Sequence, residues 1–392
     1  MKISDDCNKY TKYLSSLKIQ NSRKVNGYSD IAKKIYYELK KSDEIVSKYI
    51  TFKNNELLLE TVNYFPDGNM TTQIKEYIHN YCIYRLTYSK TIKSMHKITV
   101  SFYLTEDDLN NIHEYKDHIK LIFLWLIFAV NYSTTKCNKK ININLYLTDF
   151  LKILPNSSVY VLSPSNVNTG YTTRCSQDSN IVVYRKEEWF KVLIHESMHY
   201  LALDVDIGSK YNLYDIFKLT YEQTTMKIDE AYAEIWARIM NIYIVSYKLT
   251  DNFISFKSLS DKYFNLERIY SCYQAVKVLN FMGLEYHDLI NNNNEISLLK
   301  RKLYKENTNV FSYYVLTCIL MNNPYKFITW CYNNNTNMIK LAPIINIELF
   351  LQYFRDNYMS EALLENMITV KQLFNKDYDF DKTLKMTVIE IN

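Results

Sequence analysis

His195, Glu196 and His199 form a His-Glu-x-x-His array within the apolar segment from Lys191 to Tyr200. A helix turns by about 100° per residue, so side chains four residues apart lie on one face and can bind one metal ion. Glu196 lies beside them, where a carboxylate can accept a proton from a water molecule that zinc activates. The array therefore predicts two zinc ligands and a general base on one helix, whereas the alternative is two ordinary surface histidines.

A catalytic zinc ion takes three protein ligands and keeps a fourth position open. In the metzincin class the array continues with a glycine and a further histidine, but the residues here are Ala202 and Val205, which excludes that class. Asp204 and Asp206 follow soon after the array, and each misses by one residue the aspartate spacing of the related short-motif zincins. Asp206 is kept as an alternative ligand, and a better candidate lies downstream.

Glu230 and Glu234 are four residues apart in a second helical pattern, so they lie on one face of a helix. Ala233 and Ala237 keep that face thin, which allows this helix to pack closely against the array helix. We expect Glu230 to be the third ligand and Glu234 to orient a histidine from behind, although Glu234 is also an alternative ligand. The competing interpretation of Glu234 is a salt bridge to Arg238, which would contribute roughly 0.2–0.5 kcal/mol.

The segments before the array alternate between strand and helix patterns. Apolar residues alternate with polar ones at 98–104 and at 141–147, which predicts two half-buried strands with a long helix at 105–132 between them. A short strand at 181–184 then leads to two acidic residues, which suit the start of the array helix. The array is therefore expected on a helix that directly follows a strand.

The loop that precedes this last strand contains candidate substrate contacts. Asn166 and Asn168 stand just before Gly170, which suggests a backbone conformation that other residues resist. The two amides would either bind a peptide-like ligand or satisfy neighbouring groups in a capped surface turn. We consider both asparagines as candidate substrate-binding residues.

The length of 392 residues suits two or three structural units. Residues 1–95 mix helical and extended patterns without a catalytic spacing, residues 96–250 contain the array, and residues 251–392 show mainly helical periodicity. We expect an α+β protein in which an N-terminal α/β module and a C-terminal helical subdomain flank the unit that contains the array.

The composition is that of a globular protein, with 47% hydrophobic residues and a formal net charge of only +5. The lysine clusters are short and far apart, so we expect no nucleic-acid partner. Seven cysteines without a Cys-x-x-Cys pair are expected to be reduced thiols in a cytosolic protein. The N-terminus has no secretory pattern, and the longest apolar run, Leu121 to Val130, is about half of what a membrane span needs.

The array and the downstream glutamates resemble the gluzincin branch of the zinc metallopeptidases, because Glu230 begins a Glu-x-x-Ala-Glu motif 31 residues after His199. The longer block from Asn166 to His195 resembles the zinc metallopeptidases that are encoded by large nucleocytoplasmic DNA viruses. The similarity covers residues 96–250. One departure is Glu234, because many relatives have aspartate at this position.

This resemblance implies a zincin fold, in which a small mixed sheet lies beside the active-site helix. It also implies that the strand before this helix is an edge against which an extended substrate lies. Val182, Val183 and Tyr184 would then be substrate-binding residues. The protein would be cytoplasmic, in the host cytoplasm or in the virion if it is viral.

The expected function is hydrolysis of peptide bonds in a peptide or protein substrate, with one Zn²⁺ ion as cofactor. His195, His199 and Glu230 would hold the ion, and Glu196 would take the proton of the attacking water and pass it to the leaving amine. The group that stabilises the oxyanion is not identifiable, because any of several of the 37 tyrosines would serve.

Two alternatives come from other functional classes. A non-catalytic zincin-fold protein, structural or virion-associated, would bind zinc without hydrolysis, but Glu196 argues against it because a structural site needs no base. A nucleic-acid-associated protein that uses its scattered lysines is a weaker alternative, which a steep salt dependence of binding would support.

Overall fold

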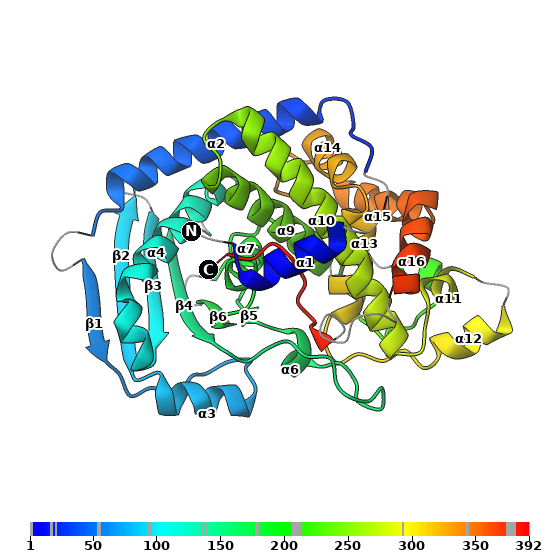
Figure 1. Cartoon of the computed structure of the whole chain (residues 1–392), viewed down its shortest axis with the longest axis horizontal. Coiled ribbons are helices and arrows are strands. Elements are labelled where there is room, and N and C mark those ends of the chain that lie inside the picture. Colours follow the sequence, from blue (N-terminus) through cyan, green and yellow to red (C-terminus); the bar gives the residue numbers. More distant parts are fainter. Residues whose placement is uncertain are drawn as a thin grey trace.

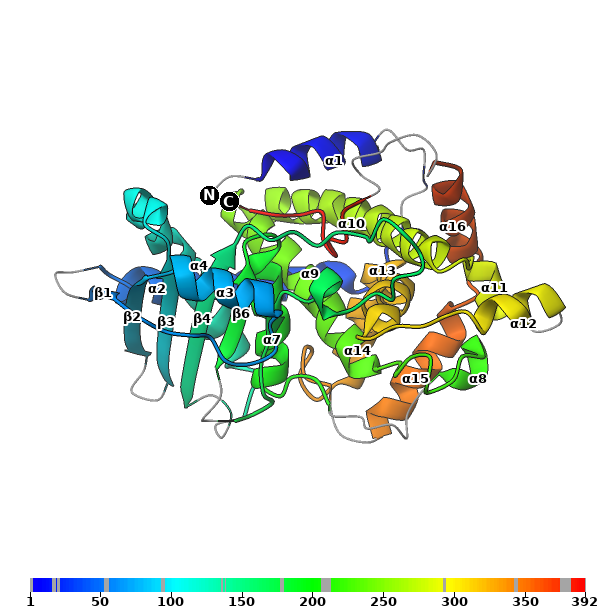
Figure 2. The ribbon, with the colours of Figure 1, turned by 90° about the horizontal axis from the view of Figure 1, so that it is seen from below.

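The computed structural model of the chain describes residues 3–15, 19, 22–52, 56–92, 96–134, 137, 139–176, 180–205, 213–291, 294–341, 345–373 and 382–391. One six-stranded sheet lies at one end of the molecule, and most of the helices gather to one side of it (Figures 1 and 2). The expected α+β class is therefore confirmed.

The strands are β1 (Leu57–Thr61), β2 (Tyr84–Ile92), β3 (His96–Leu104), β4 (Lys140–Thr148), β5 (Gly170–Tyr171) and β6 (Ile181–Arg185). They follow the spatial order β1-β2-β3-β4-β6-β5. β3, β4 and β6 run parallel to one another, and the other neighbours are antiparallel. The sheet is therefore mixed, as expected, and β1 and β5 are its edges.

The strand before the array helix does not lie at the edge of the sheet. β5 pairs with β6, with Gly170 opposite Val183 and Tyr171 opposite Val182. The loop before the array thus contains a strand of two residues, which is too short to give an alternating pattern in the sequence. The prediction of an edge at residues 182–184 is wrong, and β5 occupies that position.

The described helices are α1 (Asp5–Ser15), α2 (Tyr28–Tyr49), α3 (Thr72–Tyr81), the 3-10 helix η1 (Asp107–Asn111), α4 (Ile112–Ala129), α6 (Pro164–Val167), α7 (Trp189–Tyr200), α8 (Tyr214–Phe217), α9 (Ile228–Lys248), α10 (Phe253–Phe281), α11 (Tyr286–Ile290), α12 (Glu295–Arg301), the π-helix η2 (Phe311–Leu316), α13 (Thr317–Met321), α14 (Pro324–Asn334), α15 (Ile345–Asn357) and α16 (Glu361–Leu373). The array lies on α7 and Glu230 on α9, as the two helical patterns predict. In α14, Asn323 caps the helix and Pro324 occupies the first turn.

The alternation of side chains along β6 separates two apolar cores. Ile181 and Val183 belong to the main core together with α4, whereas Val182 and Tyr184 belong to a smaller cluster that α3 covers. Because both of its faces are covered, β6 is apolar at these four positions. The strand therefore delivers the chain to the start of α7 from a buried position.

The main core draws side chains from nearly the whole chain, from Cys7 on α1 to Ile391. β2 and β3 pair along their full lengths, so the sheet crosses the boundary expected at residue 95. The division of the chain at residues 95 and 250 stays a prediction. Of the helices described, none combines the length and hydrophobicity that crossing a bilayer requires.

Cys137 and Cys175 form a disulfide bond across a sequence separation of 38 residues. It joins the turns after α4 to the segment after β5, and the sequence gives no sign that these parts are neighbours. The other five cysteines are buried free thiols. The prediction that all cysteines are reduced is therefore wrong for this pair, and a disulfide is not typical of a reducing cytosol.

His118 on α4 is expected to make the stability of the fold depend on pH. Its ring centroid lies 4.8 Å from that of Trp189, and burial lowers the pKa of His118 to about 4. A histidine with a depressed folded-state pKa stabilises the fold above its unfolded pKa, and this contribution is lost as the pH falls from about 6.5 to about 4. His118→Phe should reduce the loss of unfolding free energy across this range by up to about 3 kcal/mol. Urea unfolding at both ends of the range measures this, and an equal pH dependence in both proteins would contradict it.

Candidate metal centre

α7 is held between β6 and α9 by its apolar side chains. Leu193, Ile194 and Met198 are completely buried, and their packing fixes the rotation of the helix about its axis. The side that remains carries His195 and His199, which lie next to α9. The apolar pattern of the sequence thus determines where the two imidazoles point.

Three ligand atoms from α7 and α9 form a nearly equilateral triangle. His195 Nε2 lies 3.1 Å from His199 Nε2, and each nitrogen lies 3.3 Å from Glu230 Oε2. Zinc binds nitrogen and oxygen at about 2.0–2.1 Å with tetrahedral geometry, which separates neighbouring ligand atoms by about 3.3 Å. His195, His199 and Glu230 can therefore hold a metal ion, and their spacing fits zinc.

The pKa values of His199 and Glu230 are shifted in opposite directions. Burial disfavours the imidazolium form of His199, but Asp204 and Glu230 raise the pKa of His199 well above its ordinary value. Burial also disfavours the carboxylate form of Glu230, but His199 and His195 hold the pKa of Glu230 well below its ordinary value. The imidazoles and the carboxylate of Glu230 thus favour one another's charged forms, and a bound metal ion would replace the protons of the imidazoles.

A carboxylate lies behind each histidine, at the ring nitrogen that faces away from the cluster. Asp204 Oδ2 is 2.6 Å from His199 Nδ1, and Glu234 Oε2 is 3.1 Å from His195 Nδ1, although the latter pair is poorly aligned for a hydrogen bond. Such partners fix the tautomer and orientation of a metal-binding histidine. The structure thus brings Glu230 to the cluster and places Glu234 and Asp204 behind it, while Asp206 lies outside the described residues.

Glu234 is a buried carboxylate with two cationic partners. Lys191 Nζ is 3.0 Å from its Oε1, and Arg238 Nε is 2.9 Å from the same oxygen. The salt bridge to Arg238 and the contact with His195 therefore coexist, although the sequence presented them as competing interpretations. These two cations already balance the charge of Glu234. Glu234 can therefore orient the ring of His195 without itself binding a metal ion.

The start of α7 is anchored to the segment 382–391. Glu188 Oε1 accepts hydrogen bonds of 2.6 Å from the backbone N–H groups of Met386 and Thr387, and its Oε2 lies 2.7 Å from Lys152 Nζ. All of these groups are buried. A buried network of polar contacts therefore fixes the end of α7 that precedes the array.

Glu196 lies against β5, and Gly170 is what allows this approach. A Cβ atom at Gly170 would lie 3.0 Å from Glu196 Cγ and 2.7 Å from the carbonyl oxygen of Val182. Gly170 is therefore needed for space and not, as the sequence suggested, for an unusual backbone conformation. No described residue donates a hydrogen bond to the Glu196 carboxylate, and burial is the largest cause of its raised pKa.

Two residues that the sequence did not single out bind the carboxylate of Glu230. Tyr313 Oη donates to Oε2 and Asn309 Nδ2 donates to Oε1, both at 3.1 Å. Tyr313 lies on the π-helix η2, a rare helix type that often marks functional sites. Neither residue lies in a recognisable motif, so only the tertiary structure identifies them.

The candidate substrate residues serve other roles in this structure. Val182, Val183 and Tyr184 are buried within the sheet and do not form an exposed surface, so their expected role at an edge is not supported. Asn166 caps α6 through Ser163, and Asn168 Oδ1 accepts a hydrogen bond of 3.1 Å from Thr308. The backbone of β5 is the part of this region that lies next to Glu196.

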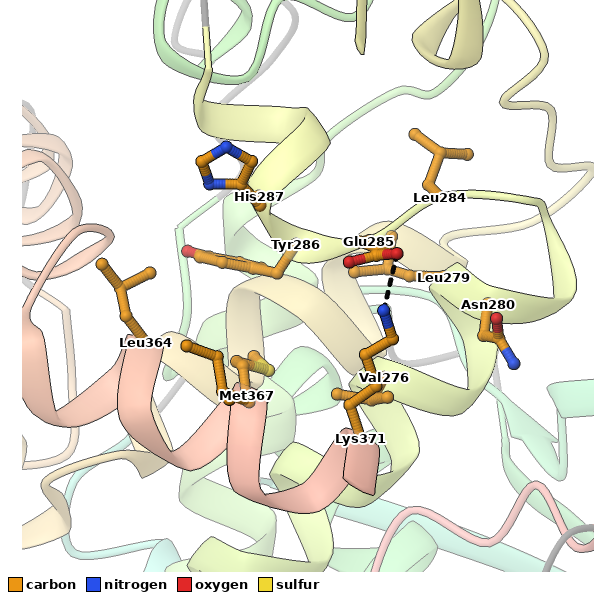
Figure 3. A pocket seen from close by; sticks show the side chains of 11 residues that line it. Val276, Leu279, Asn280, Leu284, Glu285, Tyr286, His287, Leu364, Met367 and Lys371 are labelled. Carbon is orange, nitrogen blue, oxygen red and sulfur yellow. Dashed lines mark ion pairs between the residues drawn. The ribbon is translucent and has the colours of Figure 1, made fainter. Parts of the chain in front are cut away.

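An apolar cavity of about 270 Å³ lies between α10, α11 and α16 (Figure 3). Leu279, Leu284 and Met367 contribute to its walls, and an ion pair of 2.6 Å joins Glu285 to Lys371 beside it. None of the residues that line it belongs to the metal-binding cluster. The cavity is therefore separate from the candidate metal centre.

Comparisons with protein-family models, curated proteins and solved structures find no match to this chain. The site is thus interpreted from its own geometry and chemistry.

Substituting the two glutamates of α9 should separate their roles. Glu230→Gln should weaken zinc binding by more than about 100-fold. Loss of a residue that only hydrogen-bonds to a metal ligand already lowers metal affinity by about 10–100-fold, and loss of the ligand itself should cost more. Glu234→Gln removes the nearest buried counter-charge of Lys191 and of Arg238, which are left with Glu188 at 3.9 Å and Glu267 at 4.0 Å, and it should lower the unfolding free energy of the zinc-free protein by about 3 kcal/mol. Competition with a chromophoric chelator and urea unfolding measure the two effects. Unchanged zinc affinity in Glu230→Gln would contradict the assignment.

Proposed function

We propose that this protein is a zinc-dependent metallopeptidase with a zincin-like fold. The observation that carries the proposal is the triangle formed by His195, His199 and Glu230, with the carboxylate of Glu196 next to it on α7. Among the described residues, the cluster contains three candidate ligands and no fourth. Three ligands and an adjacent base are typical of catalytic zinc, whereas structural zinc has four protein ligands. This difference favours hydrolysis over a purely structural or virion-associated role.

A zinc ion bound to these ligands would supply Lewis-acid chemistry, which activates water and polarises the scissile carbonyl. Glu196 accepts the proton of the attacking water and returns it to the leaving amine. Glu196 keeps 8% of its surface exposed and its carboxylate receives no hydrogen bond from a described residue, so it is available to a water molecule. Glu196 is thus the general base and then the general acid.

We assign Tyr313 as the residue that stabilises the oxyanion. Its hydroxyl donates to the same oxygen of Glu230 that faces the two imidazoles. From this position the hydroxyl can donate to a carbonyl oxygen that gains negative charge during the reaction, and a preorganised donor stabilises that charge. Tyr313 replaces the unidentified tyrosine of the sequence-based mechanism.

β5 is the strand on which we place an extended peptide substrate. It is an edge of the sheet, and Gly170 brings its backbone into contact with Glu196. A peptide that adds to this edge would pass beside the general base. The substrate class that follows is an unfolded peptide or an extended loop of a protein.

Glu196→Gln should strongly reduce the rate of cleavage while zinc stays bound. The amide keeps the size of the side chain but cannot accept the proton, so the rate should fall by about 10²–10⁴-fold. Metal analysis and cleavage of a peptide library measure the two properties in the wild type and the variant. Stoichiometric zinc without cleavage by the wild type would favour the structural alternative.

In protein saturated with zinc, Tyr313→Phe should lower kcat by about 10²-fold and leave KM nearly unchanged, because it removes one donor to the oxyanion. Tyr314→Phe is the matched control on the same π-helix, since Tyr314 Oη donates to the carbonyl of Leu384 and not to the cluster. Steady-state kinetics on one cleaved peptide compares them. Equal losses of kcat in the two variants would show that Tyr313 acts through packing alone.

A further inference from the structure

The chain reverses direction just after α7 and brings Asp204 back beneath His199. Ala202 has a left-handed backbone with φ 52°, and the N–H of Leu203 bonds to the carbonyl of Met198 at 2.9 Å, which closes the helix end. The side chain of Asp204 is completely buried, and its Oδ2 lies 2.6 Å from His199 Nδ1. The orientation of one metal ligand therefore depends on where this carboxylate is held.

Arg174 holds Asp204 at two places. Its guanidinium lies 2.8 Å from Asp204 Oδ1, an ion pair that is not aligned for a hydrogen bond, and a second nitrogen of the same group donates to the backbone carbonyl of Asp204. A planar guanidinium with two such contacts fixes both the side chain and the main chain of its partner. Arg174, Asp204 and His199 thus form a continuous chain of contacts that ends at the metal-binding cluster.

The position of Arg174 is itself fixed by the next residue. Cys175 is bonded to Cys137, and its N–H donates to the carbonyl of Tyr200, the last residue of α7, at 3.0 Å. Arg174 lies in a turn, outside any helix or strand. The disulfide therefore attaches this turn to the end of the helix that carries both histidines.

We infer that Arg174 is a positioning residue for the metal ligand His199, and that the Cys137–Cys175 disulfide keeps Arg174 in place. The inference rests on the proposed zinc site. It adds that the Cys137–Cys175 disulfide supports this site through Arg174. Without the link, the arginine side chain, which is 29% exposed, gains access to other conformations, and the buried Asp204 loses its counter-charge. His199 then turns more freely and binds metal less tightly.

Zinc affinity of the purified full chain, measured by competition with a chromophoric chelator, tests the arginine. Arg174→Ala should weaken zinc binding by about 10–100-fold, and Arg174→Lys should restore part of the loss because the ammonium reaches one oxygen of Asp204. Arg85→Ala is a matched control, since Arg85 pairs with Glu60 at 2.6 Å and is 37% exposed but lies on β2, away from the cluster. The absorption spectrum of the cobalt-substituted protein should change in Arg174→Ala and not in Arg85→Ala, because it reports the ligand geometry.

The disulfide is tested by Cys137→Ser/Cys175→Ser, which avoids thiol reductants that bind zinc themselves. This variant should also weaken zinc binding, and it should add no further loss in the Arg174→Ala background, because both changes break one chain of contacts. Cys272→Ser/Cys318→Ser is the matched control, since these buried thiols lie 3.5 Å apart and share a hydrogen bond but no disulfide bond. Unfolding of the zinc-free proteins separates stability from affinity.

Two results would overturn the inference: wild-type zinc affinity in Arg174→Ala, or full additivity of the arginine and cysteine effects. Zinc affinity is measured without reference to cleavage, so a lack of peptidase activity would remove the proposed function alone. A wild type that binds no zinc would overturn both.

Discussion

The structure depends on the way in which α9 presents two carboxylates, one helical turn apart, to opposite sides of His195. Glu230 lies 3.3 Å from Nε2 and Glu234 lies 3.1 Å from Nδ1. A buried carboxylate is costly unless a positive charge balances it. A lysine and an arginine balance Glu234, whereas the described donors to Glu230, apart from the two imidazoles, are neutral. This asymmetry leaves the imidazoles as the described partners that can balance the charge of Glu230, and a divalent cation between the three ligand atoms would take over that role.

Parts of the chain that are distant in sequence converge on α7 and hold it in this relation to α9. β5 packs against Glu196, and the segment 382–391 binds the start of the helix through Glu188. The disulfide-linked turn binds the end of the helix through the N–H group of Cys175. The π-helix η2 completes the arrangement from the side of Glu230. Contacts from several sides of one helix give the precision that a metal site requires.

The parts of the site that could be predicted from the sequence are those that local periodicity determines. The spacing of His195, Glu196 and His199 on one helix, and of Glu230 and Glu234 on another, follows from helical geometry, and the apolar residues show which side is buried. Tyr313 and the Cys137–Cys175 bond could not be predicted, because they depend on contacts between distant segments. A two-residue strand such as β5 has no periodicity, so its position at the edge of the sheet was also beyond prediction.

The most direct test of the account is a crystal structure of the zinc-loaded protein measured at the zinc absorption edge. The account predicts one anomalous peak at about 2.0–2.1 Å from His195 Nε2, His199 Nε2 and a carboxylate oxygen of Glu230, with solvent at the remaining position. A fourth protein ligand in that position would contradict a catalytic site. An anomalous peak elsewhere, or none at all, would contradict the metal centre itself.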